Sequence, residues 1–307
     1  MPIHLPARTS RRHFLGQLGA AFAVWSQSPA AEVDGDLVAI LNDTHIGAQQ
    51  KADSPVRQNL AATVEHLIRL PRRPAAASIN RDIALKDGQT EDDVRSAGHS
   101  QSQSVLVDLT PLRAAGIPVH LTMGNHDDRD VFYRVLANEK ADAPPVDSRH
   151  IGVVQLARVN LILLDSLKAT MTTQGLIGAE QLAWLAKILD AHAGKPAWIV
   201  VHHNPRLGGD PLHFPGGLED SEPLWQVLAG RPQAKAYLHG HIHHRNFFSH
   251  QGIHILNTPA TSYVGDKTVS TTGWTMARVN DAGAVFTTHT HLPDHPWNGL
   301  VQELAWR

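Results

Sequence analysis

Residues 236–244 read Ala-Tyr-Leu-His-Gly-His-Ile-His-His, and the rest of the chain is best understood from this stretch. Residues 234–239 have the apolar character of a short buried strand, so His241 and His243 follow its carboxyl end. In an extended chain, side chains two residues apart point to the same side. Gly240 lets the backbone bend tightly before this pair, because glycine has no Cβ. The pattern predicts two imidazoles that face one spot, a candidate metal site.

Composition narrows the class of function. The chain has 307 residues, of which 42% are hydrophobic, so it can bury a large core as one large domain or two small ones. The formal net charge of -2 argues against a nucleic-acid partner held by phosphate contacts. Because the chain has no cysteine, a metal must be held by imidazole, carboxylate, amide or water, which suits zinc, manganese, iron or cobalt. With 21 histidines, a chance pair is common, so support must come from elsewhere in the chain.

The N-terminal 30 residues predict an export signal. Residues 10–15, Ser-Arg-Arg-His-Phe-Leu, resemble a twin-arginine signal, and the apolar run over 14–25 is too short to span a bilayer. Residues 28–30, Ser-Pro-Ala, suit cleavage near Ala30; a disordered basic tail is the alternative. We expect a signal peptide over 1–30 and one domain over 31–307. The signal implies the twin-arginine export machinery as a partner, no stable membrane anchor and a periplasmic or secreted location.

Ligand-type residues follow five predicted strands. The strands are expected at 37–41, 75–80, 117–123, 196–201 and 234–239. The polar residues that follow them are, in order, Asp43 with His45, Asp82, Asn125, His202, and His241 with His243. Asp43 and His45 repeat the spacing of two residues seen at His241 and His243. Taken alone, this pair has an alternative, in which Asp43 caps a turn and His45 lies at the surface. Polar residues directly after buried strands are costly unless they bind something or reach the surface, so their repetition favours a binding site.

The remaining pattern indicates an α/β fold. Helices are expected from Ser54-Pro55 onward, over 103–109 with a stop at Pro111, over 128–138 and over 178–192. Segments 150–156 and 159–164 predict a hairpin, and four strands from 246 to 289 predict an all-β ending. Residues 206–221 are rich in glycine and proline, so we expect a loop over the site that carries His213 and Phe214. This loop is a candidate for substrate contact, and a tolerated insertion is the alternative.

The order Asp-x-His, Asp, Gly-Asn-His-Asp, His, Gly-His-x-His over residues 37–279 resembles the calcineurin-like metallophosphoesterase family. The resemblance implies a four-layer α/β/β/α sandwich with its site at the carboxyl ends of the strands. It also implies two divalent metal ions, Fe, Mn, Zn or Co. The first would be held by Asp43, His45, Asp82 and His243, and the second by Asp82, Asn125, His202 and His241. Asp82 would bridge the two ions, and His203 is the alternative to His202.

The charge of such a site suits phosphate chemistry. Two divalent ions beside Asp43 and Asp82 leave about two positive charges, which attract an anion such as a phosphoester. Two metals about 3.5–4 Å apart can generate hydroxide from bound water and clamp the attacking and leaving oxygens. His126 is the catalytic candidate that stabilises the transition state or protonates the leaving alkoxide, with Asp127 orienting it. A purely structural His126 is the alternative.

Residues 164–166, Leu-Asp-Ser, Gly175 and residues 180–185, Glu-Gln-Leu-Ala-Trp-Leu, resemble one branch of this family. That branch contains the class III cyclic-nucleotide and the glycerophosphodiester phosphodiesterases. The resemblance implies an exported metal-dependent hydrolase of small phosphoesters, with diesters favoured and no nucleic acid as a partner. Arg81 stands where the family usually has glycine before the bridging aspartate. A catalytically weakened homologue that binds metal or phosphate is therefore the alternative.

Overall fold

The computed structural model describes residues 32–46, 53–80, 82, 109–139, 144–208 and 214–306, and the structural statements below concern these residues. The expected signal peptide, Arg81 and His213 lie outside the described residues. None of the helices in the described ranges is long and apolar enough to cross a membrane.

The first of two six-stranded sheets has the order β12-β11-β10-β1-β2-β3. Strands β1, β2 and β3 are parallel, whereas β10, β11 and β12 extend the sheet in antiparallel pairs. The register sets Ile40 beside Ser78 and Asn42 beside Asn80, so β1 and β2 end side by side. The strands span β1 Glu32–Asn42, β2 Arg72–Asn80, β3 Val119–Leu121, β10 Gly273–Val279, β11 Gly283–Thr290 and β12 Val301–Ala305.

The second sheet has the order β4-β5-β6-β7-β9-β8. Its central strands β5, β6, β7 and β9 are parallel, and β4 and β8 are antiparallel edge strands. The strands span β4 Gly152–Gln155, β5 Asn160–Leu163, β6 Ala197–Val200, β7 Ala234–His239, β8 Asn246–His250 and β9 Ile253–Asn257. The polar residues that follow the parallel strands therefore lie at one edge of each sheet, where these strands have their carboxyl ends.

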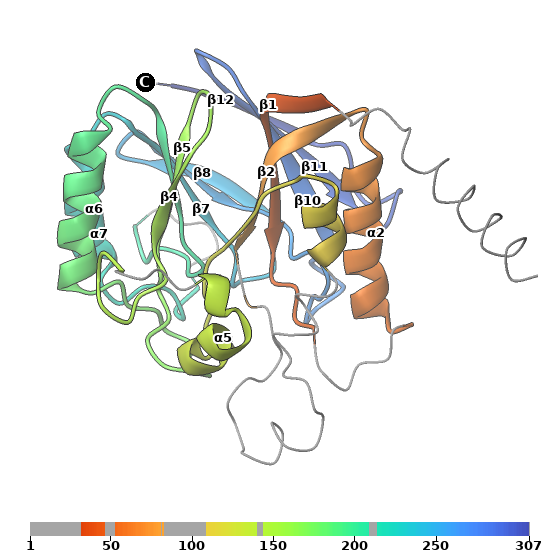
Figure 1. Cartoon of the computed structure of the whole chain (residues 1–307), viewed down its shortest axis with the longest axis horizontal. Helices are drawn as coiled ribbons and strands as arrows, with labels where there is room; N and C mark the ends of the chain where they lie inside the picture. Colours follow the sequence, from red (N-terminus) through yellow and green to blue (C-terminus); the bar gives the residue numbers. More distant parts are fainter. Residues whose placement is uncertain are drawn as a thin grey trace, which may run out of the picture.

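Helices cover the outer face of each sheet, as Figure 1 shows. Helix α2 (Pro55–Arg69) and a helical segment at 109–114 pack on the first sheet, while α6 (Ala179–Ala191) and α7 (Ser221–Ala229) pack on the second. Helix α5 (Arg129–Val135) and the 3-10 helix η1 (Ala137–Glu139) lie between β3 and β4 in the chain. The layers are therefore helix, sheet, sheet and helix, which confirms the expected four-layer α/β/β/α sandwich.

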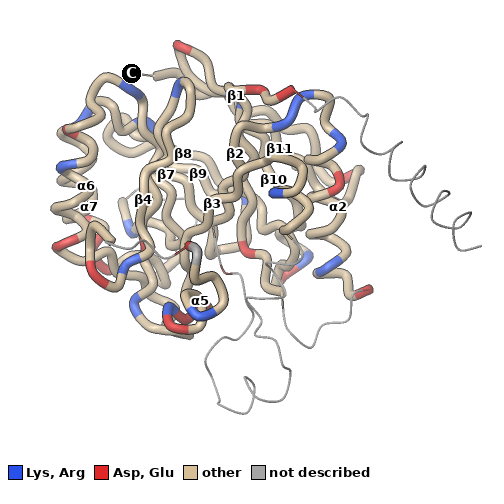
Figure 2. Tube along the Cα trace, in the orientation of Figure 1, with Lys and Arg blue, Asp and Glu red and all other residues tan. Residues whose placement is uncertain are grey.

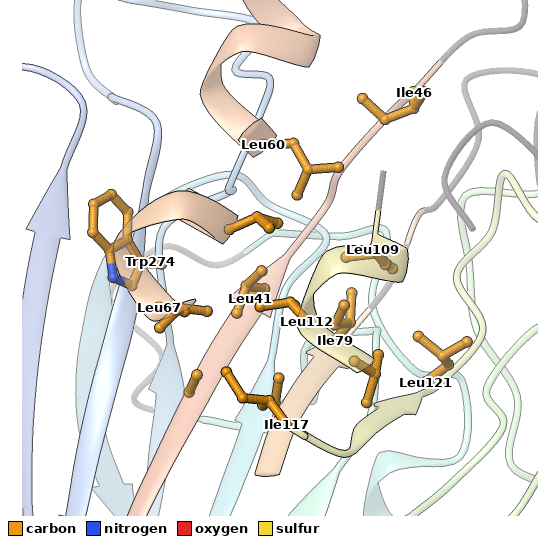
Figure 3. Packing of buried hydrophobic residues seen from close by; sticks show 14 of the residues in the cluster. Leu41, Ile46, Leu60, Leu67, Ile79, Leu109, Leu112, Ile117, Leu121 and Trp274 are labelled. Carbon is orange, nitrogen blue, oxygen red and sulfur yellow. The ribbon is translucent and has the colours of Figure 1, made fainter. Parts of the chain in front are cut away.

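Three hydrophobic cores separate these layers, and the strands alternate between them. Along β1, Val38 and Ile40 pack between the two sheets, whereas Ala39 and Leu41 pack under α2. Side chains of a strand point to opposite faces in turn, so a strand that is buried on both faces is apolar throughout. Figure 3 shows the core under α2, where Leu60 and Leu67 of the helix meet Leu41 of β1.

Most expected elements are present, and one boundary is wrong. Ser54 caps α2 by accepting a hydrogen bond from the amide of Arg57 at 3.4 Å, as its sequence predicts. The predicted stop at Pro111 is wrong, because residues 109–114 are helical. The carbonyl of Pro111 accepts from the amide of Ala115 at 3.0 Å, since proline lacks a donor but keeps its acceptor.

Two elements were not anticipated from the sequence. Helix α7 directly follows the glycine- and proline-rich loop and contains Pro223, which hides its helical pattern. Proline is tolerated there because it lies in the first turn, where backbone donors have no partner within the helix. Strand β12 is short and largely exposed, so it lacks the apolar run that marks the other strands.

Candidate metal centre

All seven predicted ligands lie at one edge of the sandwich. The carboxyl ends of β1, β2 and β3 in the first sheet meet those of β6 and β7 in the second. Asp43, His45 and His243 place one ligand atom each within 4.8 Å of one another, and so do Asp43, Asp82 and His202. Side chains far apart in the sequence therefore share one buried centre.

Two buried asparagines tie the sheets together directly beneath this centre. The Asn80 side-chain amide, at the end of β2, donates to the carbonyls of Val201 at 2.7 Å and Leu238 at 3.3 Å in the second sheet. The Asn42 side-chain amide, at the end of β1, donates to the carbonyls of His239 in β7 at 3.4 Å and of Thr258, just after β9, at 2.8 Å. The ends of β1 and β2 are thus fixed against the ends of β6 and β7.

The first group of ligand candidates combines residues from both ends of the chain. Nε2 of His45 lies 2.9 Å from Nε2 of His243 and 3.7 Å from Oδ2 of Asp82. The Asp43 carboxylate accepts from the backbone amide of His241 at 3.1 and 3.2 Å. The carboxylate next to β1 is thereby oriented by the turn after β7.

The second group lies on the other side of Asp82. Nε2 of His202 lies 3.5 Å from Oδ1 of Asp82, 3.1 Å from Oδ1 of Asn125 and 3.2 Å from Nδ1 of His241. The two Asp82 oxygens therefore face different groups, Oδ1 toward His202 and Oδ2 toward His45. This is the arrangement that a bridging carboxylate requires.

The backbone at four ligand candidates is strained, and this corrects one sequence argument. Asp43, His45, His241 and His243 have φ angles of 47°, 45°, 72° and 48°. The expected extended geometry is therefore wrong, because these residues adopt the left-handed region that side chains with a Cβ seldom enter. Such strain persists where surrounding contacts over-determine the backbone, and it gathers at functional sites.

Gly240 is required for a different reason from the one expected. Its φ lies outside the left-handed region, but a Cβ at this position would sit 2.6 Å from Oδ2 of Asp43. The absence of a side chain therefore lets the turn after β7 approach the Asp43 carboxylate. Close approach, rather than backbone freedom, is what glycine supplies here.

The doubled histidine after β6 divides into two environments. Nδ1 of His202 lies 3.6 Å from Oδ1 of Asp43, and Nε2 lies 3.5 Å from Oδ1 of Asp82, so the His202 ring faces the centre. His203 instead places Nδ1 2.7 Å from the hydroxyl of Ser166, and its ring fills the space that a side chain on Gly175 would occupy. These contacts favour His202 as the ligand candidate and give His203 a packing role.

His126 has the exposure that a group meeting substrate needs. Its side chain is 24% exposed, and its Nε2 lies 3.8 Å from Oδ2 of Asp82. Its backbone amide donates to Oδ1 of Asp82 at 2.9 Å. The Asp127 carboxylate accepts from the amide of Gly124 at 2.9 Å, which stabilises the turn that carries Asn125 and His126.

Sequence reasoning missed two groups around the centre, the carbonyl of Gly216 and the ring of Tyr263, whereas it did anticipate Phe214. The backbone carbonyl of Gly216 lies 3.2 Å from Nε2 of His241. Because a carbonyl can only accept a hydrogen bond, Nε2 of His241 carries the proton. Nδ1 of His241 therefore keeps its lone pair, which points toward His202. The Phe214 ring lies 5.3 Å from the His241 ring, so the loop expected over the site does touch it. Tyr263 packs against His45 and His243, and no spacing motif marks it.

Burial keeps the histidines of the centre neutral. It lowers the pKa of His241 to about 3 and the pKa of His243 to about 4, and it holds the pKa of His45 and His202 well below 6.5. Burial also raises the pKa of Asp43 to about 7, although the amide of His241 opposes the shift. Neutral imidazoles offer lone pairs, and a buried carboxylate with a raised pKa gains from a nearby cation. The donor set therefore fits divalent metal ions.

Comparison with known proteins agrees with this geometry. The profile of the calcineurin-like phosphoesterase family matches residues 37–245. The 3′,5′-cyclic adenosine monophosphate phosphodiesterase CpdA of Vibrio vulnificus is 28% identical over 224 residues, covering 72% of this chain and 74% of that protein. A cAMP/cGMP dual specificity phosphodiesterase of Mycobacterium tuberculosis is 29% identical over 238 residues, covering 76% and 70%. A probable cyclic nucleotide phosphodiesterase of Psychrobacter arcticus is 26% identical over 239 residues, covering 75% and 82%.

Solved structures share the fold at low sequence identity. A dimetal phosphatase from Danio rerio superposes with a TM-score of 0.68 and 14% identity, covering 88% of this chain and 99% of that chain. The structure of PhoD superposes with a TM-score of 0.57 and 11% identity, covering 90% and 70%. Both likenesses support the sandwich architecture.

The close approach between Gly240 and the Asp43 carboxylate predicts that a methyl group added at position 240 weakens metal binding. Gly240→Ala should lower divalent metal affinity about 10- to 100-fold, the usual cost of disturbing the groups that orient a ligand, because the Cβ displaces the Asp43 carboxylate. Titration with manganese by calorimetry measures the effect. Gly230→Ala is the matched control, since nothing lies within 4 Å of its added Cβ. Equal affinities in both variants would contradict the placement of Asp43.

The buried histidines predict how the metal-free protein responds to pH. Burial lowers the pKa of ten of the described histidines, and the six that are almost fully buried are His45, His202, His203, His239, His241 and His243. The unfolded chain therefore binds more protons below pH 6.5, and the free energy of unfolding falls as the pH drops from 6.5 toward 4. Each histidine contributes up to about 1.4 kcal/mol per pH unit.

The raised pKa of Asp43 opposes this trend, because the folded state then holds its proton more tightly between pH 4 and 7. Six histidines outweigh one carboxylate, so we expect lower stability at pH 5 than at pH 7. Urea unfolding in the presence of a chelator measures the difference. Unchanged or higher stability at pH 5 would contradict neutral burial of the histidines.

Proposed function

Because this chain belongs to the calcineurin-like phosphoesterase family, we propose that it hydrolyses small phosphodiesters, with cyclic nucleotides as the substrate class. The chain is a metal-dependent phosphoric ester hydrolase. The choice of cyclic nucleotides is supported by the names of its relatives in Vibrio, Mycobacterium and Psychrobacter. The convergence of Asp43, Asp82 and four histidines at one buried edge carries the proposal.

Two divalent ions are proposed to occupy the centre. Asp43, His45, Asp82 and His243 would hold one ion, and Asp82, Asn125, His202 and His241 would hold the other. When bound, such ions supply positive charge for the phosphate and activate water for attack on phosphorus. The two orientations of the Asp82 oxygens, toward His45 and toward His202, support its role as the shared ligand.

The protein's own residues position the substrate side of the reaction. His126 is partly exposed and lies beside Asp82, so it is proposed to donate a proton to the leaving alkoxide. The turn that carries it is fixed by the hydrogen bond between Gly124 and Asp127. The backbone carbonyl of Asn125 accepts a hydrogen bond from the backbone amide of Met171 at 2.6 Å. The loop that contains Met171 therefore stabilises the same turn.

Export through the twin-arginine route is part of the proposal. It rests on the pattern Ser-Arg-Arg-His-Phe-Leu at 10–15 and the small residues at 28–30. Folded proteins use this route, which suits an enzyme that acquires its metals before export.

The charges of the described chain are mixed in sign along the trace in Figure 2, and the formal net charge of the whole chain is -2. The proposed substrate is therefore a small ester rather than a nucleic acid.

Metal-dependent diester hydrolysis is the first expected outcome. After chelation, manganese, zinc or cobalt should restore hydrolysis of 3′,5′-cyclic AMP and of bis(p-nitrophenyl) phosphate, with p-nitrophenyl phosphate turned over more slowly. Asp82→Ala should lower kcat/KM by at least about 100-fold, because both ions lose a ligand. The rates are measured by nucleotide chromatography and p-nitrophenolate absorbance.

Asp281→Ala is the matched control, because its carboxylate is 90% exposed and remote from the described ligands. Full activity of Asp82→Ala would overturn the proposed centre. Two bound metals without turnover would instead support a weakened homologue, and Arg81→Gly would then be expected to raise activity. Faster turnover of the monoester would reject the preference for diesters.

The export proposal predicts the fate of a signal variant. Replacing Arg11 and Arg12 together by lysine should keep the unprocessed protein in the cytoplasm, because the export machinery reads the arginine pair. Cell fractionation with immunoblotting measures location and cleavage near Ala30. Export of the double variant at the wild-type level would contradict the twin-arginine route.

A further inference from the structure

A cavity of about 450 Å³ lies beside the candidate metal centre. We call it the Tyr263 cavity; its walls include Val56, Asn59, Ser262, Tyr263, Thr271 and Leu292. Tyr263 belongs to the cavity and to the centre, because its ring centroid lies 5.4 Å from that of His45 and 5.8 Å from that of His243. A molecule whose phosphate is held at the centre can therefore place its other end in this cavity.

The chemistry of the walls favours an uncharged, partly apolar group. Val56, Val264 and Leu292 supply apolar surface, and Tyr263 supplies an aromatic ring that is 40% exposed. Among the described lining residues, Lys267 is the one lysine or arginine, and none is a carboxylate. A cationic alcohol such as choline would meet repulsion there, whereas a neutral heteroaromatic ring would not.

Two polar side chains that border the cavity have unused hydrogen-bonding capacity. Ser262 is 2% exposed, and its hydroxyl has no hydrogen-bond partner among the described residues. The side-chain amide nitrogen of Asn59 donates to the carbonyl of Ser262 at 3.1 Å and to the hydroxyl of Thr272 at 3.2 Å. The side-chain oxygen of Asn59 is then left as an acceptor for a ligand. A buried hydroxyl without a partner is costly, so a ligand that supplies one gains affinity.

The far wall of the cavity is already rigid. His291 places Nδ1 3.0 Å from the hydroxyl of Thr272 and Nε2 3.0 Å from the hydroxyl of Thr63, so both ring nitrogens are engaged. Thr63 belongs to α2, which anchors this wall to the first sheet. A preformed cavity binds with little ordering cost.

We propose that the Tyr263 cavity binds the nucleoside of a nucleotide ester. The base stacks on the Tyr263 ring and turns its polar edge toward Ser262 and Asn59, while the phosphate lies at the metal centre. This inference rests on the proposed function and adds the residues that select the organic part of the substrate. Stacking between a base and an aromatic side chain tolerates any base, so selection is for a nucleoside rather than for one base.

Two esters with the same leaving group test the inference. Thymidine 5′-(p-nitrophenyl phosphate) and methyl p-nitrophenyl phosphate both release p-nitrophenolate and differ in the nucleoside. With manganese-loaded full-length enzyme, we expect kcat/KM to favour the thymidine ester by at least about tenfold. Tyr263→Ala should lower this ratio about tenfold, and Ser262→Ala about threefold. Ser249→Ala, an exposed serine on β8, is the matched control and should keep the ratio.

The ratio separates the cavity from the chemistry. Because Tyr263 also packs on two ligand candidates, its variant can lower both activities, whereas a lower ratio reports loss of the nucleoside site alone. A wild-type ratio near one, or a ratio unchanged in both cavity variants, would overturn this inference and leave the proposed function standing. Absence of metal-dependent turnover of either ester would overturn the proposed function and this inference with it.

Discussion

The hydrogen bonds from the Asn80 amide to the carbonyls of Val201 and Leu238 are the contacts on which the site depends. They cross from the end of β2 to the ends of β6 and β7, and the Asn42 amide makes a similar crossing from the end of β1, whereas deeper between the sheets the contacts are mainly apolar. Apolar packing is non-directional, so it sets the distance between sheets but not their register. The buried amide fixes that register and places Asp82 next to His202.

The centre combines several locally unfavourable features that the surrounding fold sustains. Asp43 and three ligand histidines occupy the left-handed backbone region, and Asp43 is buried with a raised pKa. Each feature costs free energy on its own. The apolar cores under α2 and between the sheets stabilise the scaffold that holds them. A bound cation would relieve the electrostatic part of this cost, which couples metal binding to stability.

The same edge of the sandwich holds two kinds of surface. The strand ends supply nitrogen and oxygen donors, whereas the segment after β9 brings Tyr263 and Ser262 against α2 and forms a cavity. Asn42 links them, because its backbone amide donates to the hydroxyl of Thr261 and its backbone carbonyl accepts from the Thr261 amide, just before Ser262. One short stretch next to β1 thus positions both the donors for metal and the walls that would meet the organic group.

The sequence alone determined the buried strands and the polar residues that follow them, because apolar runs and polar strand ends are local patterns. The four-layer arrangement was expected only from the resemblance of these motifs to a known family. The sequence also identified the residues that meet at the centre. The tertiary structure decided what local patterns cannot carry: the left-handed turns at Asp43 and His241, and the close approach at Gly240. It also assigned the different neighbours of His202 and His203, and it revealed Tyr263. These depend on contacts between segments some 200 residues apart, such as the one between Asp43 and His241, which no local spacing encodes.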